Sequence, residues 1–381
     1  MASGPDRSVY RPWVATVAAR IRDPVTRLRF LQSAAPSPPM PAARICGDRV
    51  RHLLSRAPRL QFVLLGIAAL TVVTLVGLVT TSNRATALPV ARLPVPRPAE
   101  LPPPEVWLVE TEGFQETYSN GLRIDSRHTV AHHPRSYLAF PADRVSPPVR
   151  RTDPVGIVFH STESHIAPFA AGQNRELQRF GESLLDYVKR KCAYNYLIDR
   201  FGRVFRIVAE SDSADHAGSS VWADGQWLYI NLNASFLGVS LEARTEPGQT
   251  EAGASPAQLR SAAMLTEMLR ARYHIPGANC VTHAQVSVNP GNSEAGYHTD
   301  WASSFPFEQL GLPDNYPQPL PAVWAFGFLA SNEFRAAAGV RMAEGIDAAE
   351  EALRTAAAES GSRPGAYRKR LQAWYRQRLA R

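Results

Sequence analysis

His160 stands at the end of a short apolar run, and this placement constrains the fold more than any other feature of the sequence. Residues 155–159 read Val-Gly-Ile-Val-Phe and lead directly into His160 and a polar loop. A run of this length and composition predicts a buried strand. The same pattern recurs at residues 281–283, which end on His283. Two buried strands are therefore expected to deliver imidazoles to polar loops.

A later carboxylate completes this set of candidate metal ligands. Asp300 lies in the loop 297–300, downstream of both predicted strands. Two histidines and one carboxylate form the three-ligand set of a catalytic zinc site, in which the fourth position stays open. His160, His283 and Asp300 therefore predict one catalytic Zn²⁺ and a hydrolase. A lone histidine at a strand end is more often structural, so this prediction depends on the three residues occurring together.

The remaining patterns predict a mixed sheet covered by helices. Further strands are expected over 194–198, 204–208 and 237–243, and helices over 175–189 and 256–273. The turn at 199–202 joins the first two strands into a hairpin. Ser255 and Pro256 supply an N-cap and a first-turn proline for the second helix. This order of elements indicates the α/β class, with a mixed central β-sheet flanked by α-helices.

An uncharged stretch near the N-terminus predicts a transmembrane helix before this domain. Residues 62–79 contain no charged side chain and reach the lower limit of about 18 residues for crossing a bilayer. Five arginines lie close before the stretch, so the positive-inside rule places the N-terminus in the cytoplasm and exports the domain. Secretion after cleavage near 85–87 is the alternative. Export permits a disulfide between Cys192 and Cys280, which the sequence leaves open.

The net charge of +8 gives no indication of nucleic-acid binding, because it is confined to one end of the chain. Residues 1–59 carry 11 Arg and 3 Asp, which equals the whole excess, so the remainder of the chain is neutral. No basic stripe with interleaved aromatic residues runs through that remainder. We therefore expect no nucleic-acid partner, and a cytoplasmic-membrane contact through the N-terminal helix.

Changes in composition divide the chain into five predicted segments. They are a basic, disordered cytoplasmic segment (1–59), a transmembrane signal-anchor (60–81), a proline-rich linker (82–105), a catalytic domain (106–321) and a helical basic C-terminal extension (322–381). The linker is expected to be an extended spacer that reaches about 50 Å. The basic tail is expected either to lie on an anionic lipid or wall polymer, or to pack on the domain.

Six short runs follow one another in a characteristic order. They are IVFHST (157–162), AYNYLIDRFGRVFRIV (193–208), DHAG (215–218), LGVSLEA (237–243), VTH (281–283) and HTD (298–300). Together they resemble the zinc-dependent N-acetylmuramoyl-L-alanine amidases of the type-2 amidase and peptidoglycan recognition protein superfamily. The resemblance implies hydrolysis of the amide bond between N-acetylmuramic acid and L-alanine, with peptidoglycan or muropeptides as partners.

The resemblance also implies roles for individual residues. His160 and His283 match the histidine ligands and Asp300 matches the third ligand. The long segment between His283 and Asp300 leaves His298 as the substitute. Tyr194 matches a tyrosine that acts beside the attacking water, and His298 is expected to donate to the oxyanion as an imidazolium.

Further roles concern the base and the substrate. Ser240 stands where the cytoplasmic recycling branch of the superfamily has its glutamate base. Glu242, on the same face of the predicted strand, is therefore the reserve base. Substrate contacts are expected from Thr162, Asn195 and His216.

Two other functions share these patterns. A peptidoglycan-binding protein would keep the fold without the chemistry, but binding-only members typically lack one metal ligand. A zinc peptidase acting within the stem peptide would share the metal, but the sequence has no HExxH motif.

Overall fold

The computed structural model describes residues 88–95, 100–246 and 248–379. The chain divides into two units, Met1–Thr81 and Ser82–Arg381, and the described residues all belong to the second. The predicted membrane helix and the basic segment before it lie outside the described residues. Within the described part, no helix combines the length and the apolar character needed to cross a bilayer.

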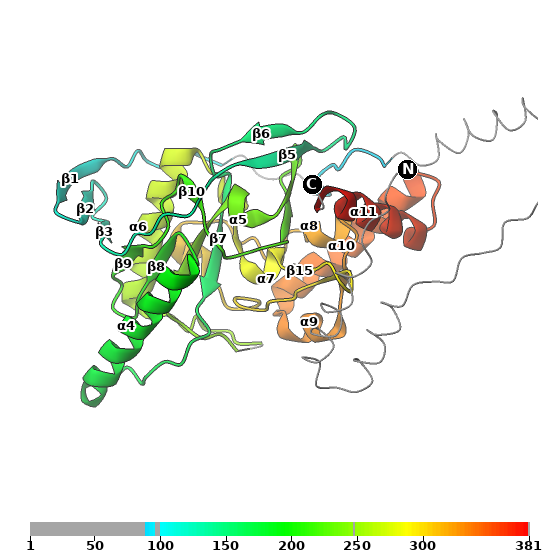
Figure 1. Cartoon of the computed structure of the whole chain (residues 1–381). Helices are drawn as coiled ribbons and strands as arrows, with labels where there is room; N and C mark the ends of the chain where they lie inside the picture. Colours follow the sequence, from blue (N-terminus) through cyan, green and yellow to red (C-terminus); the bar gives the residue numbers. More distant parts are fainter. Residues whose placement is uncertain (1–87, 96–99, 247, 380–381) are drawn as a thin grey trace, which may run out of the picture. The chain divides into compact units, whose positions relative to one another are not determined.

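An eight-stranded mixed sheet forms the centre of this unit, as the sequence predicts (Figure 1). Its strands, in spatial order, are β1 (Leu108–Glu112), β2 (Gln115–Tyr118), β3 (Arg123–Asp125), β9 (Val204–Arg206), β8 (Tyr196–Ile198), β13 (Phe236–Leu241), β7 (Gly156–Ser161) and β14 (Cys280–Thr282). The strands β8, β13, β7 and β14 run parallel, whereas β8 and β9 form the predicted antiparallel hairpin. The expectation of a mixed central sheet is confirmed.

Helices α4 (Asn174–Lys191) and α6 (Pro256–Tyr273) cover opposite faces of this sheet. Successive side chains of a strand point to opposite faces. In β8, Tyr196 and Ile198 share a core with α6, whereas Leu197 packs with α4. Helix α6 begins as predicted, with the Ser255 side chain accepting a hydrogen bond from the Gln258 backbone N–H.

Three smaller sheets and two short helices complete the region around the central sheet. They contain β4 (His133–Pro134) with β10 (Asp212–Ser213); β11 (Val221–Ala223), β12 (Trp227–Ile230), β5 (Tyr137–Pro141) and β6 (Val149–Arg151); and β15 (Val288–Asn289), β16 (Glu294–Ala295) and β17 (Leu329–Ala330). The short helices are α5 (Leu232–Ser235) and α7 (His283–Val286). The β15–β16 hairpin lies in the segment between His283 and Asp300, where it affects the position of a candidate ligand.

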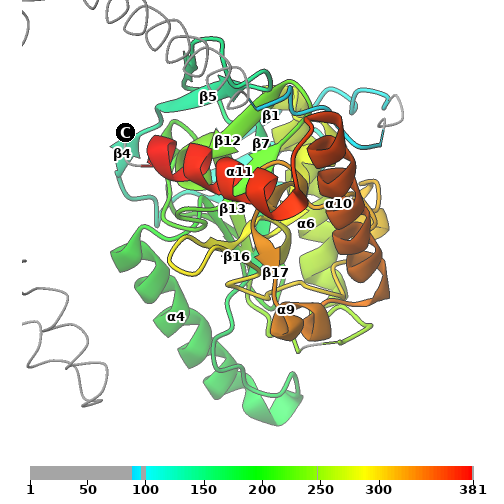
Figure 2. The ribbon, with the colours of Figure 1, turned by 90° about the vertical axis from the view of Figure 1, so that its right-hand side faces the viewer.

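The C-terminal helices belong to the same hydrophobic core as the sheet. They are α8 (Pro321–Trp324), α9 (Asn332–Ala337), α10 (Val340–Glu359) and α11 (Pro364–Leu379). Figure 2 shows α11 and α10 lying against the strand region. Phe326, Ile346 and Trp374 are buried in one cluster with residues of the sheet. The Tyr375 hydroxyl donates to the Ser219 carbonyl at 2.9 Å. Of the two arrangements expected for the tail, the described residues show packing on the domain.

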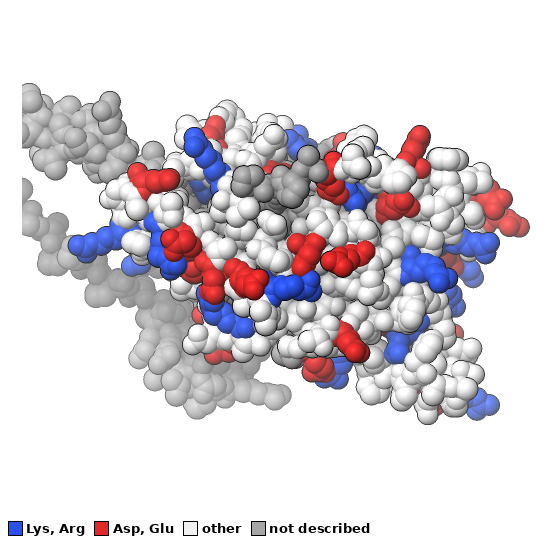
Figure 3. All heavy atoms as spheres, turned by 180° about the vertical axis from the view of Figure 1, so that it is seen from behind, with Lys and Arg blue, Asp and Glu red and all other residues white. Residues whose placement is uncertain are grey.

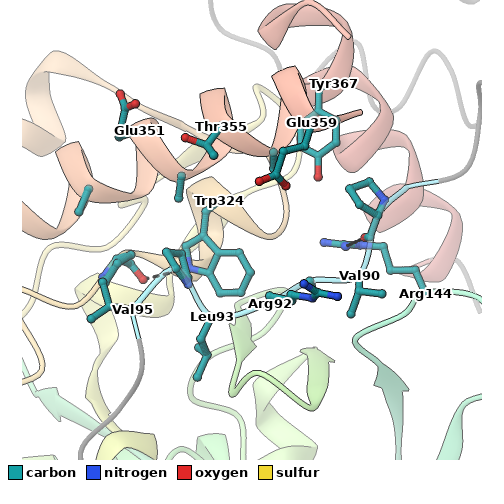
Figure 4. Close-up of a pocket in the computed structure, with 17 residues that line it drawn as sticks. Val90, Arg92, Leu93, Val95, Arg144, Trp324, Glu351, Thr355, Glu359 and Tyr367 are labelled. Carbon is teal, nitrogen blue, oxygen red and sulfur yellow. Dashed lines mark hydrogen bonds between the residues drawn. The ribbon is translucent and has the colours of Figure 1, made fainter. Parts of the chain in front are cut away.

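Part of the proline-rich segment also packs on the domain. The Ala91 N–H donates to the Ala142 carbonyl at 2.7 Å, and the Arg144 guanidinium donates to the Pro89 carbonyl at 2.8 Å. Glu100 forms an ion pair with Arg270. In Figure 4, residues around Val90 and Leu93 face α10 across a cavity of about 780 Å³. The described part of 82–105 therefore differs from the extended spacer expected, because its backbone and side chains find partners on the domain.

The two cysteines after residue 81 remain separate thiols. Cys192 ends α4 and packs in the cluster beneath that helix. Cys280 begins β14 and lies in the core shared with α6. They are therefore on opposite sides of the sheet, and the disulfide that the sequence left open is not formed.

Charged side chains of both signs are interspersed on the face shown in Figure 3. Exposed ion pairs bring opposite charges together on the C-terminal helices, as with Arg354 and Glu351 at 2.6 Å. Arg335 and Asp347 form a second pair at 2.6 Å. Exposed pairs of this kind contribute at most about 1 kcal/mol each, so they affect solubility more than stability.

Replacing Leu371 with alanine tests whether α11 is part of the core. Leu371 is fully buried, so the change is expected to lower the free energy of unfolding by about 2–5 kcal/mol. Lys369→Ala, on the exposed side of the same helix, is the matched control. Denaturant unfolding of both variants measures the difference. Equal stability of the two variants would mean that α11 packs only loosely.

Candidate metal centre

Strand β7 carries His160 into the interior on the face opposite α6. Phe159 points into the core beneath α6, so alternation turns His160 to the other face. The two neighbouring parallel strands enclose it, and Ser240 of β13 is its register partner. His160 is only 1% exposed. A histidine this deeply buried is expected to be held by specific partners.

The second histidine is positioned by the end of the adjacent strand. Thr282 is the register partner of Phe159 and caps helix α7, whose first residue is His283. The strand end and the cap together direct the His283 ring towards His160, and the two ring centroids lie 4.4 Å apart. This is the arrangement that the repeated strand-to-histidine pattern predicts.

Asp300 reaches the two histidines because the segment before it folds back on itself. The β15–β16 hairpin absorbs the extra residues, and the Gly296 N–H donates to the Ser287 carbonyl at 2.7 Å. The next residue, Trp301, is fully buried, and its carbonyl accepts from the Tyr316 hydroxyl at 2.6 Å. The unusual spacing from His283 to Asp300 is therefore accommodated by a local hairpin.

The three side chains converge on one point. His283 Nδ1 lies 2.9 Å from Asp300 Oδ1, and His160 Nδ1 lies 3.5 Å from Asp300 Oδ2. All three ligand atoms lie within 4.8 Å of one another, and no other such group occurs among the residues that the structure describes. An ion bound tetrahedrally at 2.0–2.1 Å has ligand atoms about 3.3 Å apart. The donor set and its spacing therefore fit a metal ion.

Electrostatics keep these groups in their metal-binding forms. Burial, with a further contribution from His283, lowers the pKa of His160 to about 4. Burial alone would raise the pKa of Asp300, but the neighbouring His283 and His160 outweigh this effect and hold that pKa well below its usual range. At neutral pH His160 is neutral and Asp300 is ionised, which are the forms that bind metal.

Tyr194 lies beside the cluster in an uncommon backbone conformation. Its φ is 65°, in the left-handed region, and its ring centroid lies 5.0 Å from that of His160. Burial, followed by the charge of Asp300, raises the pKa of Tyr194 to about 12. The hydroxyl is therefore protonated over the physiological range and acts as a hydrogen-bond donor. Strain of this kind is often retained at functional sites.

His298 lies at the edge of the cluster and stacks on a candidate ligand. Its ring lies 4.6 Å from that of His283, at an interplanar angle of 20°, and its backbone N–H donates to Ser287 Oγ at 2.9 Å. Burial and the neighbouring His283 lower the pKa of His298 below its ordinary value. A lowered pKa favours the neutral ring near neutral pH, and the expected role of His298 as an imidazolium donor stays a prediction.

Ser240 in β13 and Glu242, the first residue after this strand, have different surroundings. Ser240 Oγ is buried next to the Tyr194 hydroxyl and has no well-formed hydrogen bond with any described group. Such a buried hydroxyl is available to a water or substrate atom in the site. Glu242 instead accepts from the Arg200 backbone N–H at 3.1 Å, and burial raises its pKa. The contacts described for this reserve base include none with the three ligands.

The three expected substrate contacts have different outcomes. Thr162 is partly exposed just beyond β7, and its hydroxyl lies 2.8 Å from Ser164 Oγ. Asn195 is fully buried, donating to three backbone carbonyls and accepting from the Gly238 N–H, so it braces the hairpin and is unavailable to substrate. His216 has both ring nitrogens in contact with protein groups. The full burial and the protein partners of Asn195 speak against its expected contact with substrate, whereas the contact expected of the partly exposed His216 stays a prediction.

A small cavity beside Asp300 contains residues that the motifs did not single out. It has a volume of about 210 Å³ and is lined by Glu163, Thr245, Tyr297, His298, Thr299 and Asp300. Glu163 accepts from both the Thr245 N–H and hydroxyl, at 3.0 and 2.8 Å. Glu163 and Thr245 each follow a predicted strand by a few residues. This placement just beyond a strand end is the feature of the sequence that could have identified them.

Comparisons with known proteins identify the domain that contains this cluster. Residues 150–299 match the family described as Amidase_2, N-acetylmuramoyl-L-alanine amidase. This segment includes both histidines, and Asp300 follows it directly. The resemblance seen in the sequence is thus confirmed, and residues 150–299 form a domain of the type-2 amidase family.

Individual proteins show the same relationship. The chain is 30% identical over 144 residues to the N-acetylmuramoyl-L-alanine amidase AmiD of Escherichia coli (strain K12), covering 34% of this chain and 48% of that protein. The match therefore spans about half of the relative's length. A solved structure of AmiD from E. coli with a muropeptide substrate is 20% identical, covering 70% of this chain and 96% of AmiD, with a TM-score of 0.33. AmpDh3 from Pseudomonas aeruginosa is 22% identical, covering 58% and 89%, with a TM-score of 0.33.

Proposed function

We propose that this protein is a zinc-dependent amidase that cleaves the bond between N-acetylmuramic acid and L-alanine in peptidoglycan. The observation that carries the proposal is the convergence of His160, His283 and Asp300 within and directly after an amidase-family domain. Two neutral imidazoles and one carboxylate are the ligand set of a catalytic zinc site with an open fourth position. The related E. coli protein AmiD carries the name of the same activity.

The bond itself explains why such a site is needed. An amide is a poor electrophile with a poor leaving group, so its hydrolysis at neutral pH requires a strong nucleophile and a stabilised oxyanion. When bound, zinc lowers the pKa of water towards about 7 and polarises a carbonyl oxygen. His160 and His283 would hold the ion as neutral donors, and Asp300 would contribute one negative charge. The net charge at the site is then +1.

The chain's own side chains supply donors around that position. Tyr194 presents a protonated hydroxyl next to His160, where it donates a hydrogen bond to the developing oxyanion. His298 is held against His283 and adds a neutral ring N–H on the exposed side. The buried Ser240 hydroxyl orients the attacking water. These three groups also replace bulk water around the reacting carbonyl.

Two features favour catalysis over the rival functions. A binding-only relative would be expected to lack one metal ligand, whereas all three are present and buried here. The exposed lining residues of the cavity next to Asp300 include Tyr297 and Glu163, so a substrate can approach the cluster from that side. A peptidase acting within the stem peptide has no observation in its favour beyond the shared metal.

Analysis of digested peptidoglycan tests the proposal directly. Purified protein with one equivalent of Zn²⁺ is incubated with peptidoglycan, and the soluble products are identified by mass spectrometry. Free stem peptides that begin with L-alanine are expected, together with glycan strands that have lost their peptides. Cleavage at another bond would refute the amidase assignment, and binding without any product would favour the peptidoglycan-binding alternative.

We further propose that the domain acts outside the cytoplasm and is held there by the N-terminal membrane helix. The arginine-rich flank before residues 62–79 supports this orientation. Protease added to intact spheroplasts is expected to digest the domain, and protection from the protease would contradict the orientation. Recovery of the domain in the culture medium would favour secretion after cleavage.

A further inference from the structure

We propose that His216 is a positioning residue that holds the candidate metal ligand His160 in its metal-binding tautomer. This inference rests on the proposed metal site and adds a residue to it. His216 comes from the DHAG run, 56 positions along the chain from His160. No candidate metal ligand lies near His216 in the sequence.

The contacts form a continuous chain behind the ligand. His160 Nε2 lies 3.1 Å from His216 Nδ1, and the two rings meet edge to face at 85°. On the far side, His216 Nε2 lies 3.3 Å from the carbonyl oxygen of Phe236. The same carbonyl also accepts from Arg135 Nη1 at 3.0 Å.

The direction of these hydrogen bonds follows from which atoms can donate a hydrogen and which can only accept one. A carbonyl oxygen only accepts, so His216 Nε2 must carry the hydrogen. A neutral imidazole has one donor and one acceptor, so His216 Nδ1 accepts and His160 Nε2 must carry the next hydrogen. His160 Nδ1 is then left with its lone pair.

That lone pair points towards the candidate metal position. His160 Nδ1 faces Asp300 Oδ2 at 3.5 Å, so two acceptors lie opposite each other. A cation bound between the two atoms would be coordinated by both of them, which would remove the unfavourable contact between two acceptors. Metal-binding histidines almost always donate their second ring N–H to a protein acceptor, which sets the tautomer and the ring orientation. His216 Nδ1 is that acceptor.

The surrounding structure holds the His216 ring in place. Asn233 Oδ1 accepts from the backbone N–H groups of His216, Ala217 and Gly218, at 2.9, 2.7 and 2.8 Å. Gly238 of β13 lies directly against the ring, and a Cβ added there would lie 2.6 Å from His216 Cγ. The glycine in the LGVSLEA run therefore provides the space that the ring occupies.

Zinc affinity measured on the metal-free protein tests this role without using activity. His216→Leu removes the acceptor, and its dissociation constant for Zn²⁺ in chelator competition is expected to rise about 10- to 100-fold. His216→Asn keeps an oxygen acceptor near the Nδ1 position and is expected to recover most of the affinity. His133→Leu, on the exposed strand β4, is the matched control and should bind like the wild type.

The outcomes separate the inference from the proposed function. Wild-type protein that binds no zinc would refute the metal site itself. Wild-type binding together with equally tight binding by His216→Leu would overturn the role of His216 alone. Equal weakening in His216→Asn and His216→Leu would also overturn it, because the acceptor would then make no difference.

A spectroscopic measurement covers the case in which the variants fold poorly. Long-range ¹H–¹⁵N correlation spectra of the zinc-free wild type report which ring nitrogen of each histidine carries its proton. His160 and His216 are both expected to be Nε2–H tautomers. A His160 ring protonated on Nδ1 would overturn the inference.

Discussion

Replacing Asp300 with asparagine is expected to reduce amide hydrolysis by about a thousandfold or more. The asparagine keeps the shape of the side chain but removes the one negative charge among the three ligands. Loss of the metal removes several kcal/mol of transition-state stabilisation, and each 1.4 kcal/mol corresponds to a factor of about ten in rate. Metal content by mass spectrometry and release of stem peptides from muropeptides measure the two effects together.

Asp347→Asn is the matched control for this substitution. Asp347 is an exposed residue that pairs with Arg335 on the C-terminal helices, so its loss should change neither metal content nor rate. Retention of stoichiometric zinc and of the full rate in Asp300→Asn would exclude Asp300 as a ligand. His298, which stacks on His283, would then become the candidate for the third position.

Replacing Tyr194 with phenylalanine is expected to lower kcat about 100-fold while zinc content stays unchanged. The substitution removes only the hydroxyl, and loss of one donor to an oxyanion typically costs a factor of about 100 to 1,000. Burial raises the pKa of Tyr194 to about 12, so the group acts as a protonated donor throughout the neutral range. Steady-state kinetics on a soluble muropeptide separate kcat from KM.

Tyr187→Phe supplies the comparison, because Tyr187 is exposed on α4 and takes no part in the cluster. Its kinetics should match the wild type. A Tyr194→Phe protein with full kcat would assign the tyrosine to packing against His160. Loss of zinc along with activity would instead indicate that Tyr194 acts by supporting the metal site.

Local patterns predicted the parts of the fold that depend on neighbouring residues. The run before His160, the hairpin after Tyr194 and the capped start of α6 at Ser255 each follow from signals within about 20 residues, and each appears in the structure. The two histidine candidates follow the same logic, because each lies at the end of a strand, whereas Asp300 was singled out as a carboxylate in a later loop. The hairpin that brings Asp300 back was not inferred, since each of its strands has only two residues and β16 also pairs with β17 from later in the chain.

Roles that depend on contacts between residues far apart in the chain could not be predicted from the sequence. Asn195 and His216 lie in family motifs, which made them reasonable substrate contacts. Their actual partners are Gly238, Phe236 and His160, which become neighbours only through sheet register and loop packing. In the same way, the basic composition of the C-terminal tail left open whether it packs on the domain or lies on another surface.

The packing of the proline-rich segment changes where the minimal folding unit begins. A fragment trimmed at residue 106 would lose the Ala91 backbone bond to Ala142 and the Glu100 partner of the buried Arg270. A buried guanidinium that loses its carboxylate partner is costly, so such a fragment should be a poor expression target and sensitive to proteolysis. Recombinant versions of the protein should therefore start no later than Leu88, which makes this stretch an integral part of the fold.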